Sequence, residues 1–198
     1  MEKAAGTLAD ILVKKSVVEK ADRDFYRYAI ETVLIYAVNI ATMFILAAVT
    51  GKLPELALLL AVLYPLRQSC GGKHMNTWYG CYVISCSVFE ATLLISGMIH
   101  MHIAVMAAIT AVCISCIWRF APVEHHNHIL DKQDFIQNKK RARILSMSIA
   151  AAAFIFKLFG FEVGAVIYVS SEVLCSVLLL LGVLEEKRYL TSDKKFGG

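Results

Sequence analysis

The stretch GAVIYVSSEVLCSVLLLLGVL, residues 164–184, decides the fold class of this chain. It carries a single charged residue, Glu172, and it is long enough for an α-helix to cross a bilayer, which takes about 17–25 apolar residues. Further apolar runs lie at residues 30–50, 53–66, 78–99, 102–118 and 144–161. These runs are too long and too continuously apolar for barrel strands. The sequence therefore predicts an all-α, polytopic bundle of about six transmembrane helices.

The composition of the whole chain agrees with this prediction. Of its 198 residues, 58% are hydrophobic, and the mean hydropathy is +0.62. Soluble proteins are about 45–50% apolar. Since no polar interval between the runs is long enough for a soluble domain, we expect one integral domain over residues 1–198, composed of a segment 1–28, a bundle 29–184 and a tail 185–198.

The charges predict the orientation of the chain in the membrane. With six spans, eighteen of the 20 Lys and Arg residues fall in the intervals on one side of the bilayer, and two on the other. Positive residues are enriched in cytoplasmic loops, so both termini and the interval after residue 66 are expected to face the cytoplasm. The net charge of +4 is mild, and we predict no nucleic-acid partner.

Two parts of this topology are irregular. The second span, residues 53–66, is short and contains Pro54, Glu55 and Pro65, so it either crosses at a tilt or is re-entrant. The segment Ala4–Tyr28 spaces apolar and basic residues so that they separate on an amphipathic helix. This helix lies either on the inner leaflet, where membrane lipid is its partner, or against the cytoplasmic loops.

Residues 71–85, GGKHMNTWYGCYVIS, hold the side chains best suited to chemistry. Cys81 is expected in the first turn of the third span, where unpaired N–H groups and the helix dipole favour a thiolate. An imidazole is the usual activator of such a thiol, and His74 lies seven residues earlier. On one continuous helix the two residues would stand about 10 Å apart, so the backbone must fold back between them. The glycines permit this fold, although they could equally serve close helix packing.

The run Arg67-Gln-Ser-Cys-Gly-Gly-Lys-His74, followed by Cys81, resembles the accessory gene regulator B (AgrB) family of bacterial quorum sensing. The later Ala121-Pro122-Val123-Glu124 is similar to the turn after the fourth span of that family, and the size and the apolar runs fit over nearly the whole chain. The resemblance implies a cysteine endopeptidase in the bacterial cytoplasmic membrane. It also implies an AgrD-like propeptide as substrate, with an amphipathic N-terminal helix and an acidic tail.

The same resemblance implies a role for individual residues. Cys81 matches the nucleophile and His74 the general base, with Arg67, Gly71 and Gly72 as supporting residues. The enzyme would release the C-terminal tail of the propeptide and hold the remainder as a thioester. An internal Cys or Ser of the peptide would then displace the enzyme and close a thiolactone or lactone. Small residues in several spans also permit a homodimer.

The interval after the fourth span departs from the family. Some members carry lysines directly after the Ala-Pro turn, where this chain has His125, His126 and His128. The candidate substrate-docking residues are therefore the later Lys139, Lys140 and Arg141, together with Glu124. The three histidines could bind zinc, but no second pair of ligands stands at a familiar spacing. We predict no metal and no cofactor.

Two other classes of function compete with the peptidase. A small transporter or channel would use intramembrane acids such as Glu90 and Glu172, and it gives Cys81 no role. A membrane redox protein would use Cys113 and Cys116, a C-x-x-C pair within the fourth span. The remaining cysteines, Cys70, Cys86 and Cys175, have no evident partner in the sequence.

Overall fold

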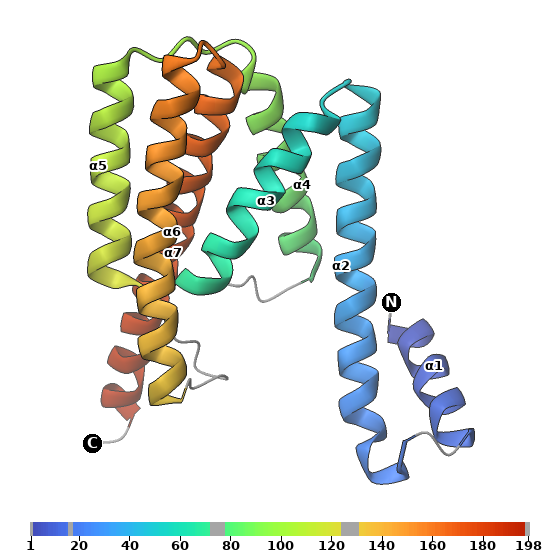
Figure 1. The fold of residues 1–198 in the computed structure, drawn as a ribbon. Helices are drawn as coiled ribbons and strands as arrows, with labels where there is room; N and C mark the ends of the chain where they lie inside the picture. Colours follow the sequence, from blue (N-terminus) through green and yellow to red (C-terminus); the bar gives the residue numbers. More distant parts are fainter. Residues whose placement is uncertain (1, 16–17, 72–77, 124–130, 197–198) are drawn as a thin grey trace. The chain divides into compact units, whose positions relative to one another are not determined.

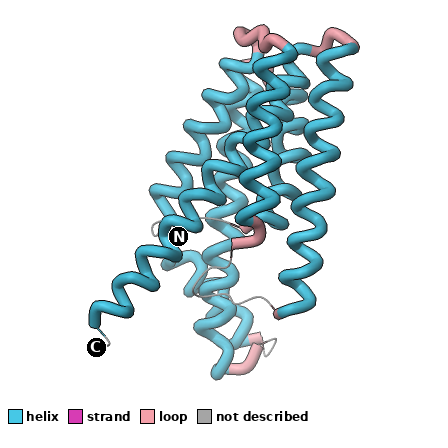
Figure 2. The backbone as a smooth tube through the Cα atoms, turned by 90° about the vertical axis from the view of Figure 1, so that its left-hand side faces the viewer, coloured by secondary structure: helices cyan, strands magenta, loops and turns pink. Residues whose placement is uncertain are grey.

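A computed structural model describes residues 2–15, 18–71, 78–123 and 131–196. The described residues are almost entirely helical, and Figure 2 shows helices joined by short loops, with no strand drawn in that part of the chain. The elements are α1 (Glu2–Lys14), η1 (Lys20–Asp22), α2 (Arg23–Val49), α3 (Leu53–Cys70), α4 (Trp78–Ser96), α5 (Ile103–Phe120), α6 (Lys132–Leu158) and α7 (Glu162–Phe196), as labelled in Figure 1.

Three of the described helices are long and apolar enough to cross a membrane. They cover Arg23–Val49, Ile103–Phe120 and Glu162–Lys187. The predicted all-α transmembrane bundle is therefore confirmed. Of the other three expected spans, α4 has a shorter apolar part, Tyr82–Ser96, while α3 and α6 contain charged residues near both ends. The number of six crossings stays a prediction.

The helices form two compact units. The first contains Met1–Gly51 and Asn76–Glu90, and the second contains Lys52–Met75 and Ala91–Gly198. The sequence predicted one integral domain, and that prediction stays open.

In the first unit, α1 packs along α2. The buried side chains of α1 are Ala5 and Ala9, which lie one turn apart and present a small, smooth face to the neighbouring helix. The exposed guanidinium of Arg23 donates to the Asp10 carboxylate at 2.7 Å. The amphipathic segment expected over Ala4–Tyr28 is thus divided, because α1 ends at Lys14 and the residues from Arg23 onward belong to α2.

The second unit is built around α7, which packs against α3, α5 and α6. Consecutive helices α5, α6 and α7 run alternately up and down (Figure 1). The buried side chains of α3 recur every three or four residues and form one stripe, Leu56, Leu59, Val62, Leu63, Leu66, Ser69 and Cys70. This spacing places them on a single helix face. The stripe therefore explains why α3 lies with its apolar face against the other helices.

Small residues bring α6 close to its neighbours. The buried side chains of this helix are Ala142, Ser146, Ile149, Ala150 and Ala153. Small side chains allow the backbones of membrane helices to approach closely. The helix begins at Lys132, well before the expected start at residue 144, so the polar part of the chain before the apolar run is helical as well.

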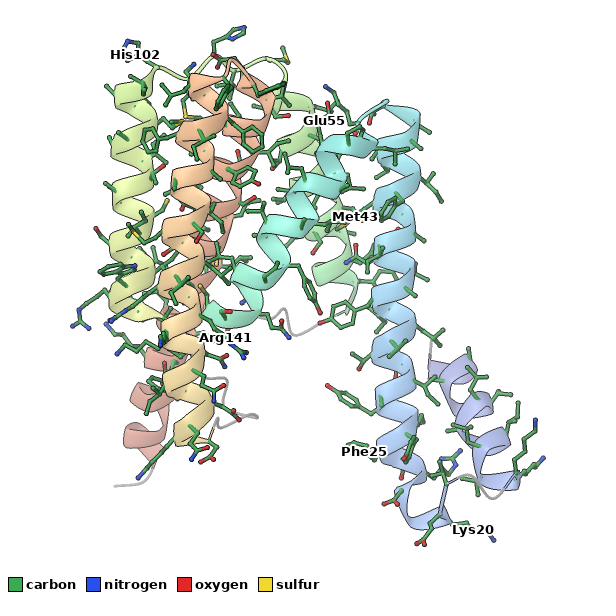
Figure 3. The ribbon with its side chains drawn as sticks, viewed as in Figure 1. Lys20, Phe25, Met43, Glu55, His102 and Arg141 are labelled. Atoms are coloured by element: carbon green, nitrogen blue, oxygen red, sulfur yellow. The ribbon has the colours of Figure 1, made fainter. Side chains whose placement is uncertain are left out.

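Two labelled residues identify the two ends of the second unit. In Figure 3, His102 marks the end at which α5 begins, and Arg141 lies toward the opposite end, where α3 and α5 finish. The latter end carries Arg67 and Gly71, two of the predicted supporting residues.

Candidate active site

The start of α4 positions the candidate nucleophile. The helix begins at Trp78, which places Cys81 in its first turn. Two polar contacts tie the next turns of α4 to α2 within the first unit. The hydroxyls of Thr42 and Tyr82 lie 2.9 Å apart, and the Cys86 thiol donates to Asn39 Oδ1 at 3.4 Å. Since such contacts hold membrane helices together, the backbone that carries Cys81 has a defined place on α2.

Several predicted site residues lie outside the described residues. His74, the candidate base, is among them, together with Gly72 and Glu124. The structure describes the chain on both sides of this region, up to Gly71 at the end of α3 and from Trp78 at the start of α4.

The turn at the end of α3 is tied to a distant part of the chain. Gly71 forms an isolated parallel β-bridge with Val123, which follows α5. The Val123 N–H donates to the carbonyl oxygen of Cys70 at 3.0 Å, and the Arg67 guanidinium donates to the carbonyl oxygen of Gly71. We call these four residues, Arg67, Cys70, Gly71 and Val123, the α3 clamp.

Glycine is required in this clamp for two reasons. Gly71 has φ +69° and ψ −151°, a region that is essentially restricted to glycine. A Cβ at this position would lie 3.2 Å from the Val123 carbonyl carbon and 3.3 Å from its nitrogen, and still closer to its oxygen. The side-chain hydrogen of glycine therefore allows both the turn and the close approach of the second segment.

The residue before this glycine contacts a second helix. Cys70 is fully buried, and its thiol lies beside the thiol of Cys175 on α7, which is also fully buried. Sequence reasoning found no partner for Cys70, Cys86 or Cys175, and the structure provides one for each. No signal in the sequence identifies these partners, because each belongs to a different helix.

The candidate docking residues lie in the first half of α6. Lys140 and Arg141 are exposed, and Lys139 is half-buried. The nearby Arg143 connects α6 to α5, because its guanidinium donates to the Trp118 carbonyl at 3.4 Å and lies 5.4 Å from the centre of the Trp118 ring. The basic stretch therefore lies at the same end of the second unit as the α3 clamp.

The remaining candidate groups lie on α5 and α7 of the second unit. Cys113 and Cys116 are free thiols. Glu172 is 1% exposed, and neither of its carboxylate oxygens has a hydrogen-bond partner within the described part of the chain. In the same part of the chain, no group of His, Cys, Asp or Glu residues could hold a metal ion.

Comparison with known proteins gives one finding. The family model described as accessory gene regulator B matches residues 5–185. No curated protein and no solved structure matches the chain. The matched range includes Arg67, the α3 clamp and the first turn of α4.

Proposed function

Because this chain belongs to the accessory gene regulator B family, which processes AgrD propeptides in quorum sensing, we propose that it is a membrane cysteine endopeptidase with Cys81 as nucleophile and His74 as general base. The substrate is an AgrD-like propeptide. The chain works in the bacterial cytoplasmic membrane, with its termini and catalytic loop on the cytoplasmic side. The observation that carries this proposal is the position of Cys81 in the first turn of α4.

The helix start supplies the electrostatics that a thiolate needs. The first N–H groups of an α-helix have no partner within the helix, and the helix dipole is positive at this end. Both effects lower the pKa of a cysteine in the first turn. A neighbouring imidazole adds to this stabilisation and accepts the thiol proton. The proposed dyad therefore needs no metal ion to generate its nucleophile.

The reaction proceeds in two acyl transfers. The Cys81 thiolate attacks the carbonyl carbon of the scissile peptide bond, after its proton has passed to His74. The imidazolium returns this proton to the nitrogen of the leaving tail as the C–N bond breaks, and a thioester remains on Cys81. A thiol or hydroxyl inside the bound peptide then gives its proton to the neutral His74 and attacks the thioester. The ring closes as a thiolactone or lactone, and Cys81 leaves as the thiolate.

The basic part of α6 fits the proposed substrate. An AgrD-type propeptide has an acidic tail, and Lys139, Lys140 and Arg141 offer positive charge at the end of the second unit that carries the clamp. Such charges mainly steer and orient a bound peptide. Their replacement by neutral residues should therefore raise KM more than it lowers kcat.

Intact-protein mass spectrometry tests the proposal directly. The purified protein in liposomes is incubated with the AgrD-like peptide encoded beside it, as wild type and as Cys81→Ala, His74→Ala and Cys116→Ala. We expect a peptide adduct that hydroxylamine removes in the wild type and in Cys116→Ala, and none in Cys81→Ala. His74→Ala should form it at least 100-fold more slowly.

The outcomes separate the candidate functions. An adduct that requires Cys116 and not Cys81, and that a thiol reductant removes while hydroxylamine does not, would be a mixed disulfide and would support the redox class. If the wild type forms no adduct and releases no tail, the peptidase proposal is wrong. The buried Glu172 would then be the first residue to test for transport.

A further inference from the structure

The α3 clamp joins two segments that are far apart in the sequence. Its acceptor, the Cys70 carbonyl, is at the last residue of α3, and its donor, the Val123 N–H, follows α5. The end of α5 holds the segment that leads to Val123. The N–H of Ala121 still donates to the Ile117 carbonyl at 2.9 Å, and both of these residues are buried. The donor is therefore held by α5 and not by a free loop.

Gly71 is held from its own helix as well. Its N–H donates to the Arg67 carbonyl at 3.1 Å, which continues the hydrogen-bond pattern of α3 by one residue. The Arg67 guanidinium then binds the Gly71 carbonyl oxygen. The peptide groups on both sides of the Gly71 Cα are thus held by named donors, one from α3 and one from the segment after α5.

We propose that Val123 is a positioning residue of the peptidase. Its backbone N–H holds the Cys70–Gly71 peptide group in place, and this fixes the point from which the chain continues toward the catalytic base. The inference rests on the proposed function. Arg67 has the same role from the α3 side. Neither residue contacts the substrate in this scheme.

The distance along the chain makes this role specific. His74 follows Gly71 by three residues, so a fully extended chain could carry it at most about 10 Å from that anchor. A general base must come within about 3 Å of the thiol whose proton it accepts. A displacement of 1 Å in such an arrangement can cost about 100-fold in rate. An anchor that moves would therefore lower the rate of chemistry and leave the binding of the peptide intact.

Removal of the single N–H tests the role of Val123. Val123→Pro lacks the donor, whereas the conservative Val123→Ala keeps it. Phe161→Pro is the matched control, because it also removes one backbone bond of the second unit, the 2.9 Å bond to Phe156 in the turn between α6 and α7. We expect Val123→Pro to lower kcat for tail release by about 10- to 100-fold with KM changed less than about twofold. Val123→Ala and Phe161→Pro should stay within about threefold of wild type.

A second measurement reports on the base itself. The rate of alkylation of Cys81 by iodoacetamide is followed against pH, with each cysteine identified by peptide mapping. In Val123→Pro the inflection should move toward the ordinary thiol value of about 8.5, because the imidazole no longer stabilises the thiolate. Val123→Ala and Phe161→Pro should keep the inflection of the wild type. A general loss of stability would not shift this profile.

The outcomes distinguish this inference from the proposed function. If Val123→Pro folds and keeps both the kcat and the alkylation profile of the wild type, the positioning role is wrong, while loss of activity in Cys81→Ala and His74→Ala still supports the peptidase. If those two variants retain activity, the peptidase itself is wrong. If Val123→Pro fails to fold, the variant Arg67→Lys tests the α3 clamp in its place. A lower kcat with unchanged KM supports the clamp, and wild-type kcat overturns it.

Discussion

Gly51 and Gly71 end two successive helices with the same φ of +69°, and yet they serve different purposes. A Cβ on Gly51 would meet no atom within 4 Å, whereas a Cβ on Gly71 would meet the backbone of Val123. Gly51 is thus needed for the conformation of a turn. Gly71 is needed for that conformation and for the approach of a second segment. Two glycines with the same φ can therefore mark a simple helix end in one place and a junction between distant segments in another.

The largest effect is expected from the same substitution at these two glycines. Gly71→Ala should destabilise the protein by about 2–5 kcal/mol, since it combines a strained φ with a clash against Val123. It should also lower tail release by about 100-fold or more. Gly51→Ala introduces only the strained φ, which should lower the free energy of unfolding by about 1–2 kcal/mol. This variant should cleave the peptide at the rate of the wild type. Unfolding in detergent and a peptide cleavage assay measure both quantities. Equal losses in the two variants would contradict the distinction.

The residue before each glycine gives the next largest effect. Cys70 is fully buried against Cys175, and Cys70→Ala should cost about 1–2 kcal/mol for the lost sulfur contacts and the cavity. Thr50 is exposed, and its hydroxyl bonds only within its own helix, to Leu46 at 2.9 Å. Thr50→Ala should therefore change the free energy of unfolding by less than about 0.5 kcal/mol. If the two substitutions cost the same, the burial of Cys70 does not contribute as we infer.

A third glycine turn, between α6 and α7, is closed in a different way. Gly160, with φ +80° and no atom within 4 Å of a Cβ, lies between α6 and α7, where Lys157 contacts both Glu162 oxygens at 2.5 and 2.7 Å. Here an ion pair closes the turn in place of a backbone bridge. Glu162→Gln should cost at most about 1 kcal/mol, because the pair is partly exposed and screened. The cost should shrink further at high salt, and unfolding at two ionic strengths checks this.

The smallest effect concerns pH and lies outside the three turns. The Arg23 guanidinium beside Asp10 lowers the pKa of that carboxyl below its usual value of 3.8. The pair therefore stabilises the contact of α1 with α2 above about pH 4, and this contribution is lost as the pH falls through the lowered pKa. Hydrogen-exchange protection of α1 should decrease on acidification, whereas the Val123 amide, which binds a carbonyl, should keep its protection. Asp10→Asn should abolish the pH response of α1.

Much of the fold could be predicted from local pattern. Apolar runs of helix length predict helices, and α4 starts at Trp78 as its run does. The apolar runs do not predict the starts of α2 and α6, because hydropathy indicates only which residues can be buried in lipid. A polar stretch such as Lys132–Arg143 can be helical without being buried in lipid. For the site, the order of Arg67, Gly71, His74 and Cys81 indicated the family, and the family match agrees. The pairing of the dyad stays a prediction.

By itself, the sequence determined the fold class, the family and the residues that could carry chemistry, because these depend on composition, spacing and motifs along the chain. The tertiary structure decided that Gly71 meets Val123, that Cys70 meets Cys175 and that Arg143 lies over Trp118. Each of these contacts joins different helices. Their formation depends on how the buried faces of the helices pack, and packing of this kind leaves no local signal in the residues it brings together.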